Sequence, residues 1–551
     1  MKKTSKLISV LLIFILSVCC FATLFGCGAK TFTEKLSSTK LPDVVPSIDD
    51  GYVDMQKFIA QSTTNDKYNV GVIECPYYEV TYSGKANGTV YSYSVPLYNQ
   101  ELHSFGYLEV SRDMLPVTVT LTSVYKGWTI SSCRVLPQKY GIEPNVTGGK
   151  VTFTINDITS YTLVFNDPEV EFLRPYTLYV KEYEEIDVPS GYELIEYKPG
   201  IHYVDRIVND DTKTSVKSNT FIYLHAGAYL IGKTPDLYTE SHNTNSHGNE
   251  AWGGFIYSPA GGENIIVKGH GIIDLTALPL HARTPIEINS NNNLTIEGIT
   301  IINSCAFTLS IRDSVNVKVK DIILMGYKTN SDGIAIINSK DVTVENCFVR
   351  SGDDLIEVKA MSKSASNSGT GGSNILFKNV QAWAVKTRCF GFIQESEMDV
   401  SGVTYEDCSV IYHDADFTMT DSFTSMGAFV VIVGDTSTIS NITFKNCDAY
   451  YASKYLINVV LADNYWTYNS CTGKIKTIIF DGMKFNDWGN GIQLVNSKNT
   501  NPNAADLSDI QFNNIEVAGE KVTDFNVLLS HINFVGVADR NCISYFNGAR
   551  V

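Results

Sequence analysis

The chain has 551 residues, with 43 Lys and Arg residues against 59 Asp and Glu residues, which gives a formal net charge of −16. Hydrophobic residues make up 44% and charged residues 19%, proportions typical of an ordered globular protein. The acidic balance argues against nucleic acid as the main partner, because phosphate binding needs clustered lysine and arginine. The 31 Tyr and 26 Phe residues against only 16 Pro residues favour strands and turns.

Residues 1–27 are predicted to be an export signal. A lysine-rich start precedes an apolar run from Leu7 to about Phe25, and Gly26 then stands before Cys27. This arrangement resembles a bacterial lipoprotein signal, in which Cys27 is acylated and becomes the mature N-terminus. An ordinary signal peptide cut nearby is the alternative, and either reading exports the protein. Residues 28–47 are then expected to form a surface tether.

Residues 48–185 are predicted to form an antiparallel β-sandwich domain. Segments 77–82, 117–121 and 150–155 alternate apolar or aromatic residues with polar ones, and Ser-Gly, Asn-Gly and Gly-Gly turn signals fall between such segments. This alternation, interrupted by turns, is typical of short antiparallel strands.

A short phrase recurs from about residue 265: apolar, polar, apolar, polar, then Asn, Asp or Gly, and usually another apolar residue. The copies begin at Ile265, Leu294, Val317, Val342, Ile375, Val403, Ile442, Ile478 and Ile510. The alternation predicts a strand with one buried face, and the Asn, Asp or Gly predicts a corner in left-handed backbone. A second short strand follows most copies. Repeats of this kind predict a parallel β-solenoid, which we assign to residues 186–551.

The residue after each corner is expected to stack on its equivalents in a column of core side chains. Cys347, Cys408 and Cys447 occupy this position, so we expect buried thiols and not redox or metal groups. The chain has no CxxC pair, which argues against a zinc site. No metal and no cofactor are therefore predicted.

Three carboxylates precede the second strand of two successive repeats. Asp332 stands in one repeat, and Asp353 and Asp354 stand 21 residues later at the same point of the next. One coil separates them, so we expect the three acids to meet in a surface groove. Close like charges are costly, and the fold gains nothing from them, although three ordinary corner residues remain the alternative. Such a cluster suits glycoside hydrolysis, in which one acid donates a proton and the others activate water.

The sequence Asn-Ser-Asp332-Gly, followed by Ser-Gly-Asp353-Asp354, resembles the Asn-Thr-Asp and Gly-Asp-Asp signature of polygalacturonase-like β-helix glycosidases. If the roles of the family's acids apply to this chain, the resemblance implies that Asp353 is the general acid of an inverting reaction. It implies that Asp332 and Asp354 hold the attacking water.

The stretch 136–155 resembles the end of the sandwich that precedes the β-helix in the related dextranase and isopullulanase family. Taken together, the two resemblances cover roughly residues 130–450. They imply an all-β chain, in which a right-handed parallel β-helix of the pectate-lyase type follows an antiparallel β-sandwich.

The chain also departs from the polygalacturonase pattern. Polygalacturonases continue with Gly-His-Gly and Arg-Ile-Lys sequences that bind the uronate, whereas this chain has Thr387-Arg-Cys-Phe in the next coil and no Arg-Ile-Lys. A neutral, α-glucan-like polysaccharide or oligosaccharide is therefore favoured over polygalacturonan.

Four further residues are predicted to bind substrate. Arg388 precedes the same strand one coil later and is expected to lie near Asp354, with a surface counter-ion as the alternative. Glu357 and Lys359 share one face of a strand, with a simple ion pair as the alternative, and Gln394 is a weaker candidate.

The sequence as a whole predicts an exported glycoside hydrolase that cleaves O-glycosidic bonds. We expect a monomer on the outer surface of a bacterial membrane, attached only through a lipid at Cys27. Three alternatives stay open: a polygalacturonase-like pectin hydrolase, a non-catalytic carbohydrate-binding β-helix surface protein, and a polysaccharide lyase on the same fold.

Overall fold

The computed structural model describes residues 35–42, 71–96, 102–166, 174–183, 186–233, 243–244, 250–251, 253–362, 371–414, 426–463, 466–498 and 501–551. The predicted signal over residues 1–27, with Cys27, lies outside these ranges. Within them, no helix combines the length and the apolar character that a bilayer span requires.

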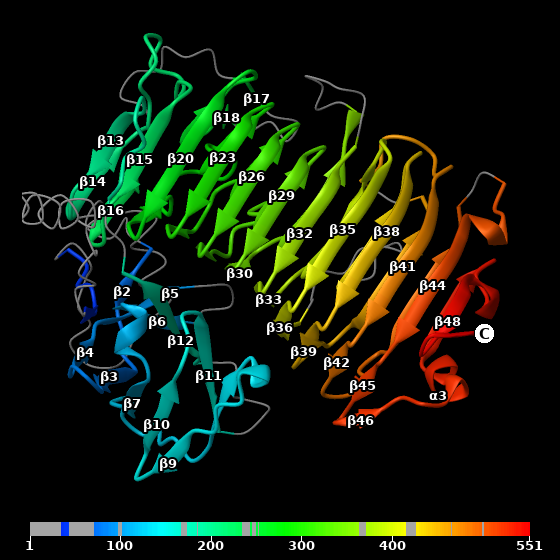
Figure 1. Ribbon diagram of the computed structural model, residues 1–551, viewed down its shortest axis with the longest axis horizontal. Helices are drawn as coiled ribbons and strands as arrows, with labels where there is room; N and C mark the ends of the chain where they lie inside the picture. Colours follow the sequence, from blue (N-terminus) through cyan, green and yellow to red (C-terminus); the bar gives the residue numbers. More distant parts are fainter. Residues whose placement is uncertain are drawn as a thin grey trace, which may run out of the picture.

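Most of the chain forms a right-handed parallel β-helix, as the sequence predicts, and the strands of its successive coils form three long sheets (Figure 1). Sheet I contains, in order, β13 (Glu193–Tyr197), β15 (Thr220–Leu224), β20 (Glu263–Gly269), β23 (Asn292–Glu297), β26 (Val315–Lys320), β29 (Lys340–Glu345), β32 (Ser373–Lys378), β35 (Val400–Glu406), β38 (Thr438–Lys445), β41 (Lys474–Asp481), β44 (Leu507–Asn513), β48 (Ile543–Phe546) and β49 (Ala549–Arg550). The nine strands from β20 to β44 are those of the recurring phrase.

Sheet II follows sheet I in each coil. It contains β14 (Gly200–Val204), β16 (Ala228–Gly232), β21 (Ile272–Asp274), β24 (Thr300–Ile302), β27 (Ile323–Met325), β30 (Phe348–Ser351), β33 (Gln381–Ala384), β36 (Ser409–His413), β39 (Asp448–Ala449), β42 (Lys484–Phe485), β45 (Glu516–Val517) and β46 (Glu520–Lys521).

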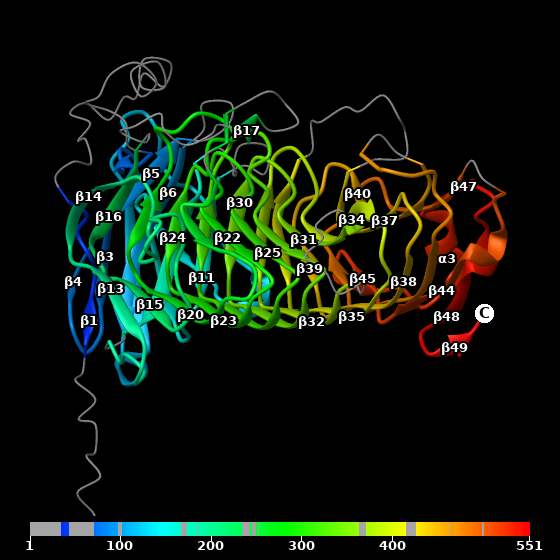
Figure 2. The same ribbon diagram turned by 90° about the horizontal axis from the view of Figure 1, so that it is seen from above.

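Sheet III completes the coil (Figure 2). It contains β19 (Ile256–Ser258), β22 (Ile286–Asn289), β25 (Leu309–Arg312), β28 (Ile334–Ile337), β31 (Ile356–Ala360), β34 (Phe390–Ser396), β37 (Gly427–Val433), β40 (Tyr455–Leu461), β43 (Ile492–Asn496) and β47 (Ile532–Gly536). A short helix, α3 (Phe525–Ser530), precedes β47 near the C-terminal end.

The predicted corners between sheets I and II are confirmed. All have positive φ, between 49° and 119°: Gly269, Gly298, Asp321, Asn346, Asn379, Asp407, Asn446, Gly482 and Asn514. Only glycine adopts this backbone freely, and Asn and Asp tolerate it better than other residues, which explains the recurring choice.

The stacked core column is confirmed as well. Cys347, Cys408 and Cys447 are buried, and all three are free thiols. Aromatic rings add a second column, in which Phe377, Tyr405, Phe444, Phe480 and Phe512 stack with successive centroids 4.7–5.3 Å apart. Each coil therefore buries its apolar face against its neighbours, which is the source of solenoid stability.

The fourth residue of the phrase, directly before the corner, alternates in charge along sheet I. Paired positions run Lys268, Glu297, Lys320, Glu345, Lys378, Glu406, Lys445 and Asp481. Opposite charges directly across a strand pair are favourable and like charges are not. This charge ladder therefore favours the observed register of the coils.

The N-terminal part of the described chain forms two facing sheets. One has the order β2 (Ile73–Glu74), β5 (Ser92–Pro96), β6 (Leu102–Val110), β12 (Tyr176–Glu182), β11 (Ser160–Phe165) and β8 (Cys133–Leu136). The other has the order β4 (Gly88–Val90), β3 (Tyr78–Ser83), β7 (Val117–Ser123), β10 (Lys150–Ile155) and β9 (Asn145–Thr147). A buried apolar cluster fills the space between them, as in a β-sandwich.

Part of the expected tether over residues 28–47 folds onto this sandwich. Strand β1 (Leu36–Ser37) pairs antiparallel with β6, and the backbone N–H of Leu41 donates to the Tyr93 hydroxyl at 2.6 Å. Leu41 is buried. The expectation of a surface tether is therefore wrong for residues 35–42, because an apolar side chain and backbone groups of this segment find partners on the sandwich.

The sandwich packs against the outer face of sheet II, beside the first half of the β-helix (Figure 1). Phe105 and Tyr179 of the sandwich share one buried cluster with Phe348 and Trp383 of sheet II. His103 accepts a hydrogen bond from Arg350 at 3.0 Å, and the Arg350 guanidinium lies 4.4 Å from the Trp383 ring centroid. Trp383 is therefore an interface residue and is not available to stack on a sugar.

Candidate active site

The acid cluster lies where sheet II turns into sheet III. Phe307, Asp332, Asp354 and Arg388 take the same place in four successive coils, two residues before Leu309, Ile334, Ile356 and Phe390, which pair with one another. The register of the solenoid therefore aligns these side chains in a row. Asp353 precedes Asp354 in the same turn, so the row carries a third carboxylate.

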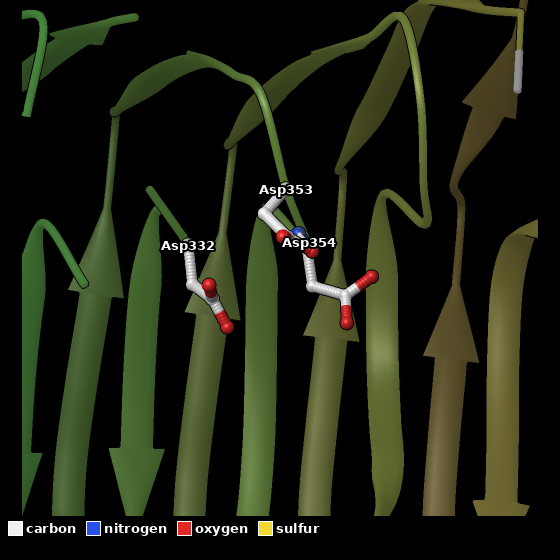
Figure 3. A group of neighbouring side chains, drawn as sticks. All are labelled: Asp332, Asp353 and Asp354. Carbon is white, nitrogen blue, oxygen red and sulfur yellow. Dashed lines mark hydrogen bonds between the residues drawn. The ribbon is translucent and has the colours of Figure 1, made fainter. Parts of the chain in front are cut away.

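The predicted clustering of the three acids is confirmed (Figure 3). Asp332, Asp353 and Asp354 each offer a carboxylate oxygen, and these oxygens all lie within 4.8 Å of one another. The three side chains line a cleft of about 190 Å³ on the surface. This separation is short enough for one water molecule to bond two of the acids.

Asp353 is held by backbone groups. Its Oδ2 accepts a hydrogen bond from the N–H of Asn330 at 2.9 Å, and its Oδ1 accepts from the N–H of Asp354 at 3.0 Å. Burial, followed by the charge of Asp354, raises the pKa of Asp353 in spite of these bonds. A carboxyl with a raised pKa and access to the cleft can keep a proton and donate it.

Asp354 is paired with Arg388, as the sequence suggests. Its Oδ2 accepts from the Arg388 guanidinium at 2.7 Å, and its Oδ1 accepts from the Arg388 backbone N–H at 3.2 Å. Both residues are only 3% exposed, so the pair is shielded from solvent. The pairing orients Asp354, and Arg388 is not a surface counter-ion.

Asp332 and Lys359 belong to a buried charge network. Lys359 Nζ lies 3.5 Å from Asp332 Oδ2, 3.2 Å from Glu357 Oε2 and 3.5 Å from Glu395 Oε2. Burial, with the charges of Glu357 and Asp353, raises the pKa of Asp332 well above its usual value. Glu357, Glu395 and Asp332 together raise the pKa of Lys359 well above its ordinary value, although burial opposes this. Lys359 is thus held as a cation among three carboxyl groups.

Glu357 does not reach the cleft. Its side chain is completely buried beneath the network, so the expectation that it binds substrate directly is wrong. The alternative of an ion pair with Lys359 is the arrangement observed. Burial is the main cause that raises the pKa of Glu357 to about 8. The sequence shows only that residue 357 faces away from the solenoid core, and side chains of neighbouring coils cover that face.

Gln394 and Glu395 reach the cleft through a bulge in β34. Val358 pairs with Phe392 and Ala360 with Ser396, so β34 has two more residues than β31 between these pairs. Gln394 has φ +23°, and both Gln394 and Glu395 line the cleft. The bulge re-aims these side chains, which is a common use of bulges near active sites.

Phe307 and Trp466, which were not predicted, also line the cleft. Phe307 extends the row of Asp332 by one coil toward the N-terminus, so the phrase spacing could have found it. Trp466 lies in the long segment between β40 and β41, for which the repeat gives no register.

Known proteins resemble this chain in sequence and in fold. Residues 280–523 match the Glycosyl hydrolases family 28. A polygalacturonase of Chamaecyparis obtusa is 31% identical over 99 residues, which are 18% of this chain and 17% of that protein. An exopolygalacturonase of Arabidopsis thaliana is 26% identical over 135 residues, 24% of this chain and 30% of that protein. The chain thus spans less than a third of the length of these curated relatives.

Among solved structures, Dex49A from Penicillium minioluteum has a TM-score of 0.53 at 14% identity, covering 94% of this chain and 99% of that chain. At this identity the likeness shows a shared fold. With the family match, it confirms the predicted resemblance to β-helix glycoside hydrolases of the pectate-lyase type.

Proposed function

From the family 28 glycosyl hydrolase domain in its β-helix, we propose that the protein cleaves O-glycosidic bonds in a neutral, α-glucan-like polysaccharide or oligosaccharide, with inversion at the anomeric carbon. The observation that carries this proposal is the convergence of Asp332, Asp353 and Asp354 in one cleft, with oxygens within 4.8 Å of one another.

The surroundings of the three acids support a division of roles. Asp353 donates its proton to the leaving glycosidic oxygen, because its raised pKa favours the protonated form and it lines the cleft. Asp354, ion-paired with Arg388, accepts the proton of the attacking water. Asp332 holds that water from the neighbouring coil. Bond cleavage and proton transfer then balance, since one acid loses a proton and another gains one.

The charges of the cleft support a neutral substrate. Lys359 is surrounded by Asp332, Glu357 and Glu395, and Arg388 is paired with Asp354. Each cation therefore already has acid groups of the protein as its partners. A uronate carboxylate would have to compete with these acids for the two cations, which is unfavourable in a partly buried site.

Digestion of a glycan panel with NMR analysis of the anomers tests this proposal. We expect products from α-glucans such as dextran, with the first product released in the anomeric form opposite to that of the cleaved bond. Retention of configuration would overturn the inverting mechanism. In retaining enzymes the two catalytic carboxyl groups lie about 5–5.5 Å apart. Release of products from polygalacturonate alone would overturn the proposal of a neutral substrate and would favour a pectin hydrolase.

We also propose that the protein acts outside the cell as a monomer, attached to the membrane through acylated Cys27. The basic start and the apolar run before Gly26-Cys27 support this. Metabolic labelling with palmitate tests it. Wild type should carry the label and sediment with membranes, and Cys27→Ser should do neither. Label retained by Cys27→Ser would contradict the anchor.

A further inference from the structure

An aromatic wall that the proposed chemistry does not use lines the cleft. Trp466, in the segment between β40 and β41, is 37% exposed and lines the same cleft as the three acids. Phe307 lines the cleft from the coil before Asp332, and its ring lies 4.9 Å from Lys359 Nζ. A large aromatic side chain left open to solvent in a cleft gains free energy when a ligand covers it.

The chain segment that carries Trp466 is anchored at a buried acid. Asp435 is completely buried, and its Oδ1 accepts from the backbone N–H of Tyr468 at 2.8 Å and of Asn469 at 2.7 Å. Its backbone oxygen accepts from the N–H of Thr472 and of Gly473, each at 3.0 Å. Asp435 thus ties the chain after Trp466 to the end of β37.

The same acid also ties this segment to the strand that carries two cleft residues. Asp435 Oδ2 accepts from the backbone N–H of Ser396 at 3.1 Å, and Ser396 ends β34 directly after Gln394 and Glu395. The bulged strand and the segment with Trp466 therefore share one anchor. The cleft wall is pre-organised, which lowers the entropic cost of binding a ligand against it.

We propose that Trp466 forms a sugar-binding subsite, in which the apolar face of a neutral pyranose ring packs on the indole while the adjacent glycosidic bond faces the three acids. Phe307 provides a second aromatic surface beside Asp332. A pyranose presents C–H groups on its faces and hydroxyl groups around its edge, so its face suits an aromatic ring and its edge suits Gln394 and Glu395. This inference rests on the proposed function and adds to it the residue that selects the substrate.

The test measures binding in an Asp353→Asn background, in which the proposed acid can no longer donate a proton. Isomaltohexaose and hexagalacturonate are titrated separately, and binding is followed by tryptophan fluorescence and by calorimetry. We expect isomaltohexaose to bind and to change the fluorescence. Adding Trp466→Ala should weaken binding by about tenfold, and Trp466→Phe should weaken it less, because a ring is retained.

Trp488 provides the matched control. Trp488 lies between β42 and β43, and its ring stacks on that of His531 with the ring centroids 4.0 Å apart. Adding Trp488→Phe should leave both the affinity and the fluorescence change intact.

The outcomes separate this inference from the proposed function. Isomaltohexaose binding that Trp466→Ala leaves unchanged overturns the subsite and leaves the proposed function standing. Binding of hexagalacturonate alone overturns the neutral substrate, and with it the neutral-sugar subsite. If neither probe binds to the Asp353→Asn protein, both proposals are overturned.

Discussion

Arg388 holds Asp354 from one coil further along the β-helix, with its guanidinium 2.7 Å from Asp354 Oδ2 and its backbone N–H 3.2 Å from Oδ1. The two residues occupy equivalent positions in successive coils, so the register that pairs Ile356 with Phe390 also brings the charges together. A side chain outside the acid cluster therefore fixes the orientation of one of its members.

Arg388→Met should lower kcat by about tenfold to a hundredfold, because Asp354 loses its counter-ion and its orientation. It should also destabilise the fold by about 3–5 kcal/mol, since it leaves a buried carboxylate unpaired. Arg388→Lys keeps the charge and should recover part of both losses. Steady-state kinetics and urea denaturation measure the two effects. Equal activity of Arg388→Met and wild type would contradict a role for this pair in the reaction.

Glu357→Gln should make the stability of the protein less sensitive to pH. The pKa of Glu357 is raised from its ordinary value of 4.5 to about 8 in the fold, so between these pH values the folded state keeps a proton that the unfolded state releases. The free energy of unfolding therefore falls as the pH rises through this window, and glutamine removes that dependence.

Melting temperatures of wild type and Glu357→Gln at pH 5, 6, 7 and 8 measure this effect. The melting temperature of Glu357→Gln minus that of wild type should increase with pH. Glu79→Gln, at an exposed position of β3, provides the control. A difference that is constant or shrinks with rising pH would show that Glu357 is ionised in the fold.

The sequence predicts those features of the fold that the repeat encodes. The period of two and the recurring corner residue place Asp332, Asp354 and Arg388 in one row, because each coil carries them at the same distance from the same strand. Structural features that interrupt the repeat cannot be predicted from that period. The bulge in β34 and the segment with Trp466 break the repeat, so no register argument could place them.

The sequence also says little about which outer faces are covered. Trp383 points outward from sheet II, as a sugar-binding side chain would, but the sandwich covers it completely. Leu41 lies in a polar stretch that reads as a tether, yet it is buried against the sandwich. In both cases a partner far away in the sequence decides the environment.

Trp383→Ala should destabilise the protein by about 3–5 kcal/mol, because it empties a buried volume between the sandwich and sheet II. The two parts share this apolar core, so we expect them to unfold together in one transition in urea. Fluorescence and circular dichroism should therefore report the same midpoint. Two separate transitions in the wild type would contradict a cooperative interface.

Glu345→Lys should weaken the charge ladder of sheet I. The substitution places three lysines in a row, since residue 345 pairs with Lys320 and Lys378. We expect a loss of about 0.5–1 kcal/mol at low salt, which shrinks in 1 M NaCl because salt screens exposed charges. Glu345→Gln is the control and should lose less. A loss that does not depend on salt would point to packing and not to charge.

A chelator should leave the activity unchanged. The three acids lie close enough together to hold a cation, and a lyase would use a divalent ion to neutralise a uronate. The proposed hydrolysis needs only a proton donor and a water molecule. Activity in EDTA and absorbance at the wavelength of unsaturated sugars measure the difference. Activity lost in EDTA and restored by Ca²⁺, or an unsaturated product, would favour the lyase alternative.

Reducing sugar released from dextran by wild type and by Asp353→Asn tests the central claim most directly. If Asp353 protonates the leaving oxygen, wild type should release sugar steadily, and the variant should lose at least about a hundredfold in kcat while still folding and binding isomaltohexaose. An Asp353→Asn protein that hydrolyses dextran as fast as wild type would contradict the account.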